Sequence, residues 1–233
     1  MVSGNPWGIP MRLIKALIIA CLLLIAGFGI YLKNGSEELL PFYVDGDLTP
    51  QWIVAGTAGY GGIHKVAPFR LTNQHAEMVT QETFNGKIYV ADFFFATCPG
   101  ICSSMTQNML KIQEAFKDDA DVLFLSHSVT PEIDTVPVLN RYAEEYGIMK
   151  DKWHLVTGPR KDIYTLARQS YFAEEDLGLP VEEDDFLHTE LFFLIDIHGR
   201  IRGIYKGTFP NEMTRLIEDI RILKQEGDML AAW

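Results

Sequence analysis

One short stretch constrains the fold of this chain more than any other: a buried strand that runs directly into a pair of cysteines. Residues 87–95, KIYVADFFF, form a β-branched and aromatic run that is typical of a strand buried on both faces. Cys98 and Cys102 follow in the sequence TCPGIC, and residues 103–116 after them carry apolar side chains at helical spacing. The order of strand, cysteine loop and helix places both thiols where a sheet meets a helix N-terminus.

Strands and helices alternate on both sides of this stretch. The expected elements are a hairpin over 68–80 that turns at 73–75, strands over 121–129 and 153–158, helices over 134–146 and 159–172, a hairpin over 189–207 that turns at 198–200, and a last helix over 211–225. They predict an α/β fold with a mixed sheet flanked by helices. Ligands of such sheets bind beyond the carboxyl ends of the parallel strands, where Cys98, Cys102 and the segment after Val129 should meet.

An uncharged run over residues 16–32 is just long enough to cross a bilayer as a helix. Arg12 and Lys15 precede the run and Glu37 follows it, so the basic bias keeps the N-terminus in the cytoplasm. A cleaved signal peptide would have a shorter apolar core and a clear small-residue cleavage site, so an uncleaved anchor is preferred. We predict a single-pass inner-membrane protein, with its anchor within 1–33 and its C-terminal domain facing the periplasm or the outside.

The composition of the chain indicates where the packed domain lies and which kinds of partner and disulfide pattern to expect. Residues 34–65 form a glycine-rich, linker-like lead-in, so the packed domain is expected over 66–233. The net charge of −11 comes mostly from scattered acidic residues and argues against nucleic acid as a partner. The chain has 3 cysteines, and Cys21 lies in the apolar run, so they do not form a secreted disulfide framework. The other two cysteines therefore need a local explanation.

The spacing of Cys98 and Cys102 suits metal or redox chemistry. If the loop is already turning into the helix, both sulfurs point to one side. A helix N-terminus lowers the pKa of a thiol, and the thiolate is the form that binds metals or attacks disulfides. Two thiolates select soft ions, and one imidazole would complete a three-coordinate site suited to Cu(I). Structural zinc would need two more ligands, and two merely buried cysteines are disfavoured because Pro99 and Gly100 predict an exposed turn.

Any of six histidines could supply the imidazole: His64, His75, His127, His154, His188 and His198. His188 directly precedes the late strand and follows an acidic loop. His127, near the end of the strand over 121–129, is its rival, whereas His198 in a hairpin turn is expected only to be solvated. The residues themselves leave the choice between His188 and His127 open.

These motifs resemble the SCO/SenC proteins, thioredoxin-like factors that help to build the dinuclear copper centre of cytochrome c oxidase. The resemblance covers roughly residues 66–207 and is carried by PFRLT, FFFATCPGIC, SVTPEIDT and HTELFFLID, with a membrane anchor ahead of the domain. It implies a thioredoxin-like fold and a copper site made of Cys98, Cys102 and His188. It also implies cytochrome c oxidase subunit II or another cuproprotein as the client, and an upstream copper donor. One departure is Thr130, where family members often carry an aspartate.

Asp92 is a further candidate in the resemblance to thioredoxins. It precedes Cys98 by six residues, which is the spacing of the buried aspartate thought to assist proton transfer in those proteins. A buried carboxyl there would have a raised pKa and could accept a proton from a cysteine. The alternative is an aspartate that faces solvent at the edge of the strand.

Two functions follow from these residues. In the first, Cu(I) is held and passed on by ligand exchange, which needs no catalytic turnover. In the second, the chain is a membrane-anchored thiol-disulfide oxidoreductase: Cys98 attacks a partner's disulfide, Cys102 resolves the intermediate, and the partner's cysteines stay reduced for metallation. Thioredoxin-type reductases usually have a cis-proline where this chain has Leu187 and His188, which favours copper. A peroxidase is less favoured, because Thr97 directly adjoins Cys98 whereas peroxiredoxins have two residues between them.

Overall fold

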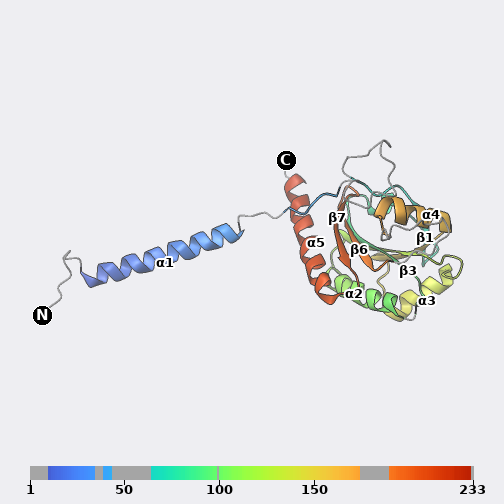
Figure 1. Cartoon of the computed structure of the whole chain (residues 1–233), viewed down its shortest axis with the longest axis horizontal. Helices are drawn as coiled ribbons and strands as arrows, with labels where there is room; N and C mark the ends of the chain where they lie inside the picture. The colour runs from blue at the N-terminus through green and yellow to red at the C-terminus, as the bar shows by residue number, and fades with distance from the viewer. Residues whose placement is uncertain (1–9, 35–38, 44–63, 99, 174–188, 232–233) are drawn as a thin grey trace, which may run out of the picture. The chain divides into compact units, whose positions relative to one another are not determined.

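A computed structural model describes residues 10–34, 39–43, 64–98, 100–173 and 189–231 of the chain (Figure 1). The chain divides into two compact units, Met1–Leu39 and Leu40–Trp233. The elements of the second unit are β1 (Arg70–Asn73), β2 (Met78–Thr80), the 3-10 turn η1 (Gln81–Phe84), β3 (Ile88–Phe94), α2 (Ile101–Ala115), β4 (Val122–Ser128), α3 (Val136–Tyr146), β5 (Trp153–Thr157), α4 (Arg160–Leu166), the π-helical turn η2 (Ala167–Tyr171), β6 (Leu191–Ile195), β7 (Ile201–Lys206) and α5 (Pro210–Ala231).

The first unit contains a single described element, the helix α1 (Met11–Asn34). Within the described part of the chain, no helix meets the length and apolarity needed to cross a membrane. The predicted anchor over 16–32 and the location that depends on it therefore stay predictions.

The second unit is built on one seven-stranded sheet with the order β2-β1-β5-β4-β3-β6-β7. The three central strands β3, β4 and β5 are parallel, and the remaining pairs are antiparallel. The predicted parallel unit, with its two hairpins, is therefore present. The early hairpin extends one side of the sheet, since β1 pairs with β5, and the late hairpin extends the other, since β6 pairs with β3.

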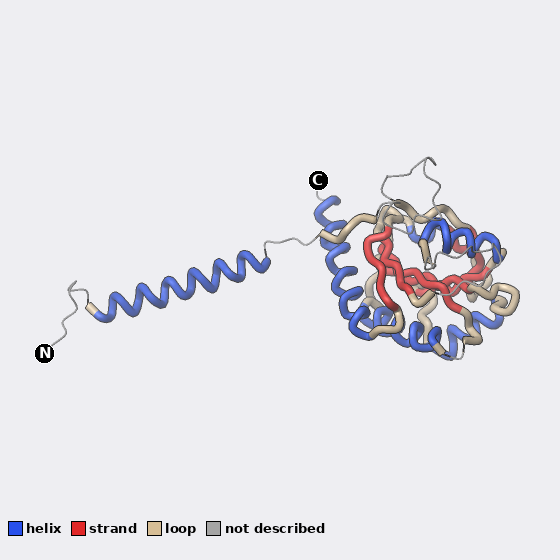
Figure 2. The backbone as a smooth tube through the Cα atoms, viewed as in Figure 1, coloured by secondary structure: helices blue, strands red, loops and turns tan. Residues whose placement is uncertain are grey.

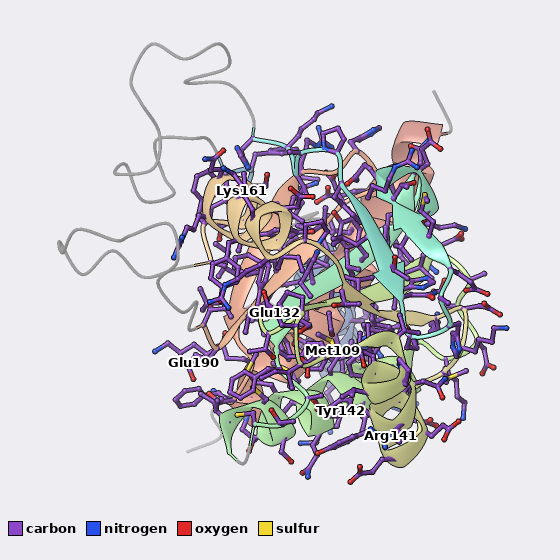
Figure 3. The ribbon with its side chains drawn as sticks, turned by 90° about the vertical axis from the view of Figure 1, so that its right-hand side faces the viewer. Met109, Glu132, Arg141, Tyr142, Lys161 and Glu190 are labelled. Atoms are coloured by element: carbon purple, nitrogen blue, oxygen red, sulfur yellow. The ribbon has the colours of Figure 1, made fainter. Side chains whose placement is uncertain are left out.

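Side chains of β3 alternate between two core layers, as the pleat of a strand requires. Val90 and Phe94 pack in the layer formed with α2, α3 and α5. Tyr89 and Phe93 pack on the opposite face, in the layer formed with α4 and η2. Figure 2 shows helices on both sides of the sheet, and Figure 3 labels two side chains of the first layer, Met109 of α2 and Tyr142 of α3.

All four predicted helices of the second unit differ from the structure at an end. The helix predicted over 134–146 begins at Val136, and the one predicted over 211–225 runs over Pro210–Ala231. The helix expected over 103–116 starts two residues earlier, at Ile101, so Cys102 lies inside its first turn. The helix expected over 159–172 is α4 followed by the π-helical turn η2, and it ends at Phe172 with φ of 52°, in the left-handed region. The widening to a π-turn buries Tyr171 fully against β3 and β6.

A buried ion cluster around Arg202 of β7 joins the start of the second unit to its C-terminal helix. The Arg202 guanidinium donates hydrogen bonds to Glu226 Oε2 (2.7 Å), to Asp196 Oδ2 (3.3 Å) and to the Leu40 carbonyl (2.8 Å). Glu226 Oε1 accepts from the Leu40 N–H at 2.9 Å. Arg202 is only 2% exposed and Glu226 is buried, so water could not replace Arg202 as the partner of Glu226 without local opening; Asp196 also pairs with Arg200 at 2.7 Å.

We expect Arg202→Met to lower the free energy of unfolding by about 3–5 kcal/mol, because it leaves the buried Glu226 carboxylate without its cation, whereas Asp196 keeps its ion pair with Arg200. The matched control is Lys117→Met, which removes an exposed ion pair with Glu114 and should change the free energy of unfolding far less, because water screens that pair. Urea unfolding followed by circular dichroism measures both. A loss for Arg202→Met as small as that of the control would contradict the structural role of the cluster.

Candidate functional site

The end of β3 and the start of α2 together position the two cysteines. After Phe94 the chain makes a tight turn over residues 95–98, the thiol turn, closed by a hydrogen bond from the Cys98 N–H to the Phe95 carbonyl (3.2 Å). Helix α2 then begins at Ile101, and no side chain caps its N-terminus. The first amides of a helix need acceptors, so they are available to a sulfur that lies close to them.

Cys98 is the more accessible and more acidic of the two thiols. Its partial burial alone would raise its pKa. Hydrogen bonds from the amides of Cys102, Gly100 and Ile101, and from the Cys102 thiol, outweigh that effect and leave the pKa of Cys98 below its ordinary value. The site therefore favours a thiolate at Cys98, which is the form needed to bind a soft metal or to attack a disulfide.

Cys102 has the opposite character. Burial raises the pKa of this thiol to about 12; a backbone hydrogen bond at Phe95 opposes the rise, and the Cys98 sulfur and the Asp92 charge add to it. Both cysteines are free in the structure. The pair therefore combines a more acidic thiol near the surface with a less acidic, buried thiol.

Asp92 is buried rather than solvent-facing, with 3% of its surface exposed. It lies on β3 between Val90 and Phe94, and strand alternation directs it to the same layer as Cys102. The Ser126 hydroxyl donates to Asp92 Oδ1, and the Trp153 indole N–H donates to that hydroxyl at 2.8 Å. Burial raises the pKa of Asp92 to about 7, although the bond from Ser126 lowers it. Its predicted role as a proton acceptor stays a prediction.

The histidine candidates are in different places. His127 lies on the sheet face opposite Cys102, stacked on Phe93 with ring centroids 4.7 Å apart. Its Nδ1 lies 3.1 Å from the Asp92 carbonyl, and burial lowers its pKa to about 4, so the ring is neutral. His198 is exposed in the turn between β6 and β7, as expected. His188 lies outside the described residues.

Among the described residues, the two cysteine sulfurs are therefore the candidate metal donors at this site. Across residues 64–98, 100–173 and 189–231, no three His, Cys, Asp or Glu side chains form a group able to hold a metal ion. Cys98 and Cys102 supply two soft donors, which fits Cu(I), an ion that accepts low coordination numbers. Any further ligand has to come from outside the described residues or from a partner.

Asp134 is a buried carboxylate beside the site that the sequence interpretation missed, because it was assigned to the start of a helix. The helix α3 begins instead at Val136. Asp134 has no exposed surface, and its Oδ2 accepts a hydrogen bond from the Ala96 N–H in the thiol turn (3.1 Å). The signal in the sequence was the pair of hydroxyl residues at the strand end, Ser128 and Thr130, which both donate to the same oxygen.

Known proteins resemble this chain over most of the second unit. The SCO1/SenC family model matches residues 58–224. The SCO1 protein homolog of Bacillus subtilis is 31% identical over 160 residues, which cover 68% of this chain and 82% of the relative. A solved structure of BsSco is also similar. BsSco is a member of the Sco family of cytochrome c oxidase assembly proteins, and a disulfide switch was identified in it. The two chains are 28% identical with a TM-score of 0.56, and the match covers 67% of this chain and 93% of the BsSco chain.

A second structural relative is the copper-bound ScoI of Bradyrhizobium japonicum. It is 25% identical, covers 66% of this chain and 98% of its own, and gives a TM-score of 0.53. Together with the strand order, these likenesses confirm the predicted thioredoxin-like mixed sheet flanked by helices.

The raised pKa of Asp92 predicts a stability that depends on pH. Between its ordinary value of 3.8 and about 7, the folded chain binds a proton at Asp92 that the unfolded chain does not. Stability should therefore fall as pH rises through this window and level off above it. Asp92→Asn removes the titration, so the variant should gain on the order of 2–4 kcal/mol over the wild type between pH 4 and pH 8.

Urea unfolding at the two pH values tests this expectation, with the exposed Asp118→Asn as the matched control. The stability difference between Asp118→Asn and the wild type should be the same at both values. If the stability difference between Asp92→Asn and the wild type is also the same at both pH values, Asp92 titrates as an ordinary surface carboxyl and the expectation is wrong.

Proposed function

Because the chain belongs to the SCO1/SenC family, we propose that it holds Cu(I) through Cys98, Cys102 and His188 and delivers the ion to cytochrome c oxidase subunit II or another cuproprotein. Copper is the cargo, received from an upstream donor. The observation that carries the proposal is the pair of free thiols at the N-terminus of α2, one of which is favoured as the thiolate. The copper-bound relative ScoI supports the choice of metal.

The position of β6 supports His188 as the third ligand. β6 runs antiparallel to β3, so the first residue of β6, Leu191, lies toward the end of β3 that leads to Cys98. Three residues of chain span at most about 10 Å. The Cα atom of His188 therefore cannot lie more than about 10 Å from that of Leu191. His127, in contrast, is separated from Cys102 by the sheet itself.

Delivery by ligand exchange uses the difference between the two sulfurs. When Cu(I) binds, both thiols give up their protons, and the negative sulfurs share the charge of the ion. Cys98, the more exposed donor, is the one that a client's thiolate can approach first. Replacement of one ligand at a time moves Cu(I) without any change in its oxidation state.

We expect a reduced fragment that begins at Asn34 to bind one Cu(I) under anaerobic conditions. His188→Ala should weaken its affinity by more than about 100-fold, since changes to outer-shell partners alone typically cost 10–100-fold. His198→Ala is the matched surface control, and His127→Phe tests the rival while preserving the aromatic stack; both should stay close to the wild type. Competition with a chromophoric Cu(I) chelator measures the affinities.

Equal loss in His188→Ala and His127→Phe, or no loss in either, would refute this set of ligands. A folded wild type that binds no Cu(I) but reduces disulfides would instead support the second candidate function, a thiol-disulfide oxidoreductase. The unequal thiols and the buried Asp92 favour that candidate as a separate activity of the same pair.

In this second function the Cys98 thiolate attacks a disulfide of the partner, which breaks that bond and releases one partner thiolate. Cys102 then passes its proton to Asp92 and attacks the Cys98 sulfur, which frees the partner's second sulfur. The partner gains two electrons and the chain is left with a Cys98–Cys102 disulfide. An external dithiol must reduce that disulfide before another cycle.

We also propose that residues 16–32 anchor the chain in the inner membrane and that the lead-in over 34–65 connects the anchor to a domain over 66–233 outside the cytoplasm. The uncharged sequence of this run and its helical conformation in α1 support the anchor.

When expressed in bacterial cells, the full chain should stay in the membrane fraction after alkaline carbonate extraction, whereas a chain that begins at Asn34 should be released. Protease added to spheroplasts should digest the domain of the full chain while a cytoplasmic marker survives. Release of the full chain by carbonate, or protection from protease in intact spheroplasts, would contradict the anchor or its orientation.

A further inference from the structure

A single buried carboxylate oxygen ties the thiol turn to the loop after β4. Asp134 Oδ2 accepts hydrogen bonds from the Ala96 N–H (3.1 Å), the Ser128 hydroxyl (2.6 Å) and the Thr130 hydroxyl (3.0 Å). Two of these donors belong to the end of β4 and its loop, the segment marked by Glu132 in Figure 3. The third belongs to the thiol turn, which carries Cys98. The contact therefore links two segments that are 38 positions apart.

The contact with Ala96 reaches the thiol turn close to its working sulfur. Ala96 is the second residue of the four-residue turn that closes from the Cys98 N–H to the Phe95 carbonyl. A nearby backbone bond, from the Val129 N–H to the Phe94 carbonyl (2.8 Å), holds the end of the strand but not the turn itself. The carboxylate after β4 therefore contacts the thiol turn itself, two residues before Cys98.

The surroundings of Asp134 make this contact strong. The side chain has no exposed surface, and its other oxygen, Oδ1, has no hydrogen-bond partner among the described residues. The three donors therefore all act on Oδ2. Hydrogen bonds to a carboxylate are stronger than those between neutral groups, and water cannot replace them at a buried position.

We propose that Asp134 is a positioning residue for the dithiol: it holds the thiol turn so that the Cys98 sulfur stays against the first amides of α2. The inference rests on the proposed function only in taking Cys98 as the working sulfur. It applies equally to a sulfur that carries copper and to one that exchanges disulfides.

The test uses the reduced, metal-free full chain in detergent and measures the rate of Cys98 alkylation by iodoacetamide at one fixed pH, with the modified residue identified by mass spectrometry. Asp134→Ala should slow alkylation by about fivefold or more, since the sulfur loses amide contacts that favour the thiolate. Asp134→Asn should largely restore the rate, because its amide oxygen can still accept from Ala96.

Ala96→Pro removes the N–H in question, and Ala96 is at the second position of the turn, which proline favours. It should slow alkylation about as much as Asp134→Ala, and the double variant should be no slower than either single variant, because both changes break one contact. Ser128→Ala and Thr130→Val are the matched controls. They remove the other two donors, so they should lower stability in urea yet keep the rate within about twofold of the wild type.

Two outcomes would overturn the inference. The first is that Ser128→Ala and Thr130→Val slow alkylation of Cys98 as much as Asp134→Ala does. The second is that the double variant is slower than either single variant, with a fold-change equal to the product of those of Asp134→Ala and Ala96→Pro. If Asp134→Ala does not fold, Ala96→Pro alone decides, since an unchanged rate in that folded variant refutes the role. Copper binding by the wild type is measured separately, so the proposed function and this inference can fail independently.

Discussion

The site depends on the parallel register between β3 and β4. Phe94 pairs with Ser128, so both strands end at the same edge of the sheet and their outgoing loops start side by side. This register brings the Ser128 hydroxyl, the Asp134 carboxylate and the Ala96 amide to one point. A shift by one residue would reverse the faces of β4 and separate these groups. The position of Cys98 is thus a consequence of strand pairing as much as of its own loop.

The same register distributes the polar groups of the two strands between the faces of the sheet. Asp92 pairs with Ser126, and both point into the layer of α2, where the Trp153 indole completes the hydrogen-bond chain. Phe93 pairs with His127, and their rings stack on the other face. A buried carboxyl therefore lies on the side of the thiols, while the imidazole of β4 is held neutral on the side away from them.

Local patterns made the elements and the two cysteines predictable, whereas contacts between distant segments were not. The strand at 87–95 and the helix after it could be recognised because composition and periodicity belong to single segments. The face occupied by His127 could not, because every residue of β4 is buried and alternation leaves no trace in such a strand. Asp134 could not either, because an aspartate before a helix ordinarily indicates a cap, whereas here Thr135 occupies the cap position and the carboxylate turns back to the strand end.

The two proposed chemistries compete for the same electrons. A Cys98–Cys102 disulfide has no thiolate left to bind Cu(I), and a bound Cu(I) occupies the sulfur lone pairs that would attack a disulfide. Both chemistries require the buried Cys102 thiol, whose pKa is raised, to lose its proton: in the first when Cu(I) binds its sulfur, in the second when that sulfur attacks Cys98. In the proposed role of Asp92 as proton acceptor, this carboxyl, whose pKa of about 7 lies close to neutrality, would take that proton in either case. The buried carboxyl of Asp92 therefore bears on both proposed functions and does not by itself favour one of them.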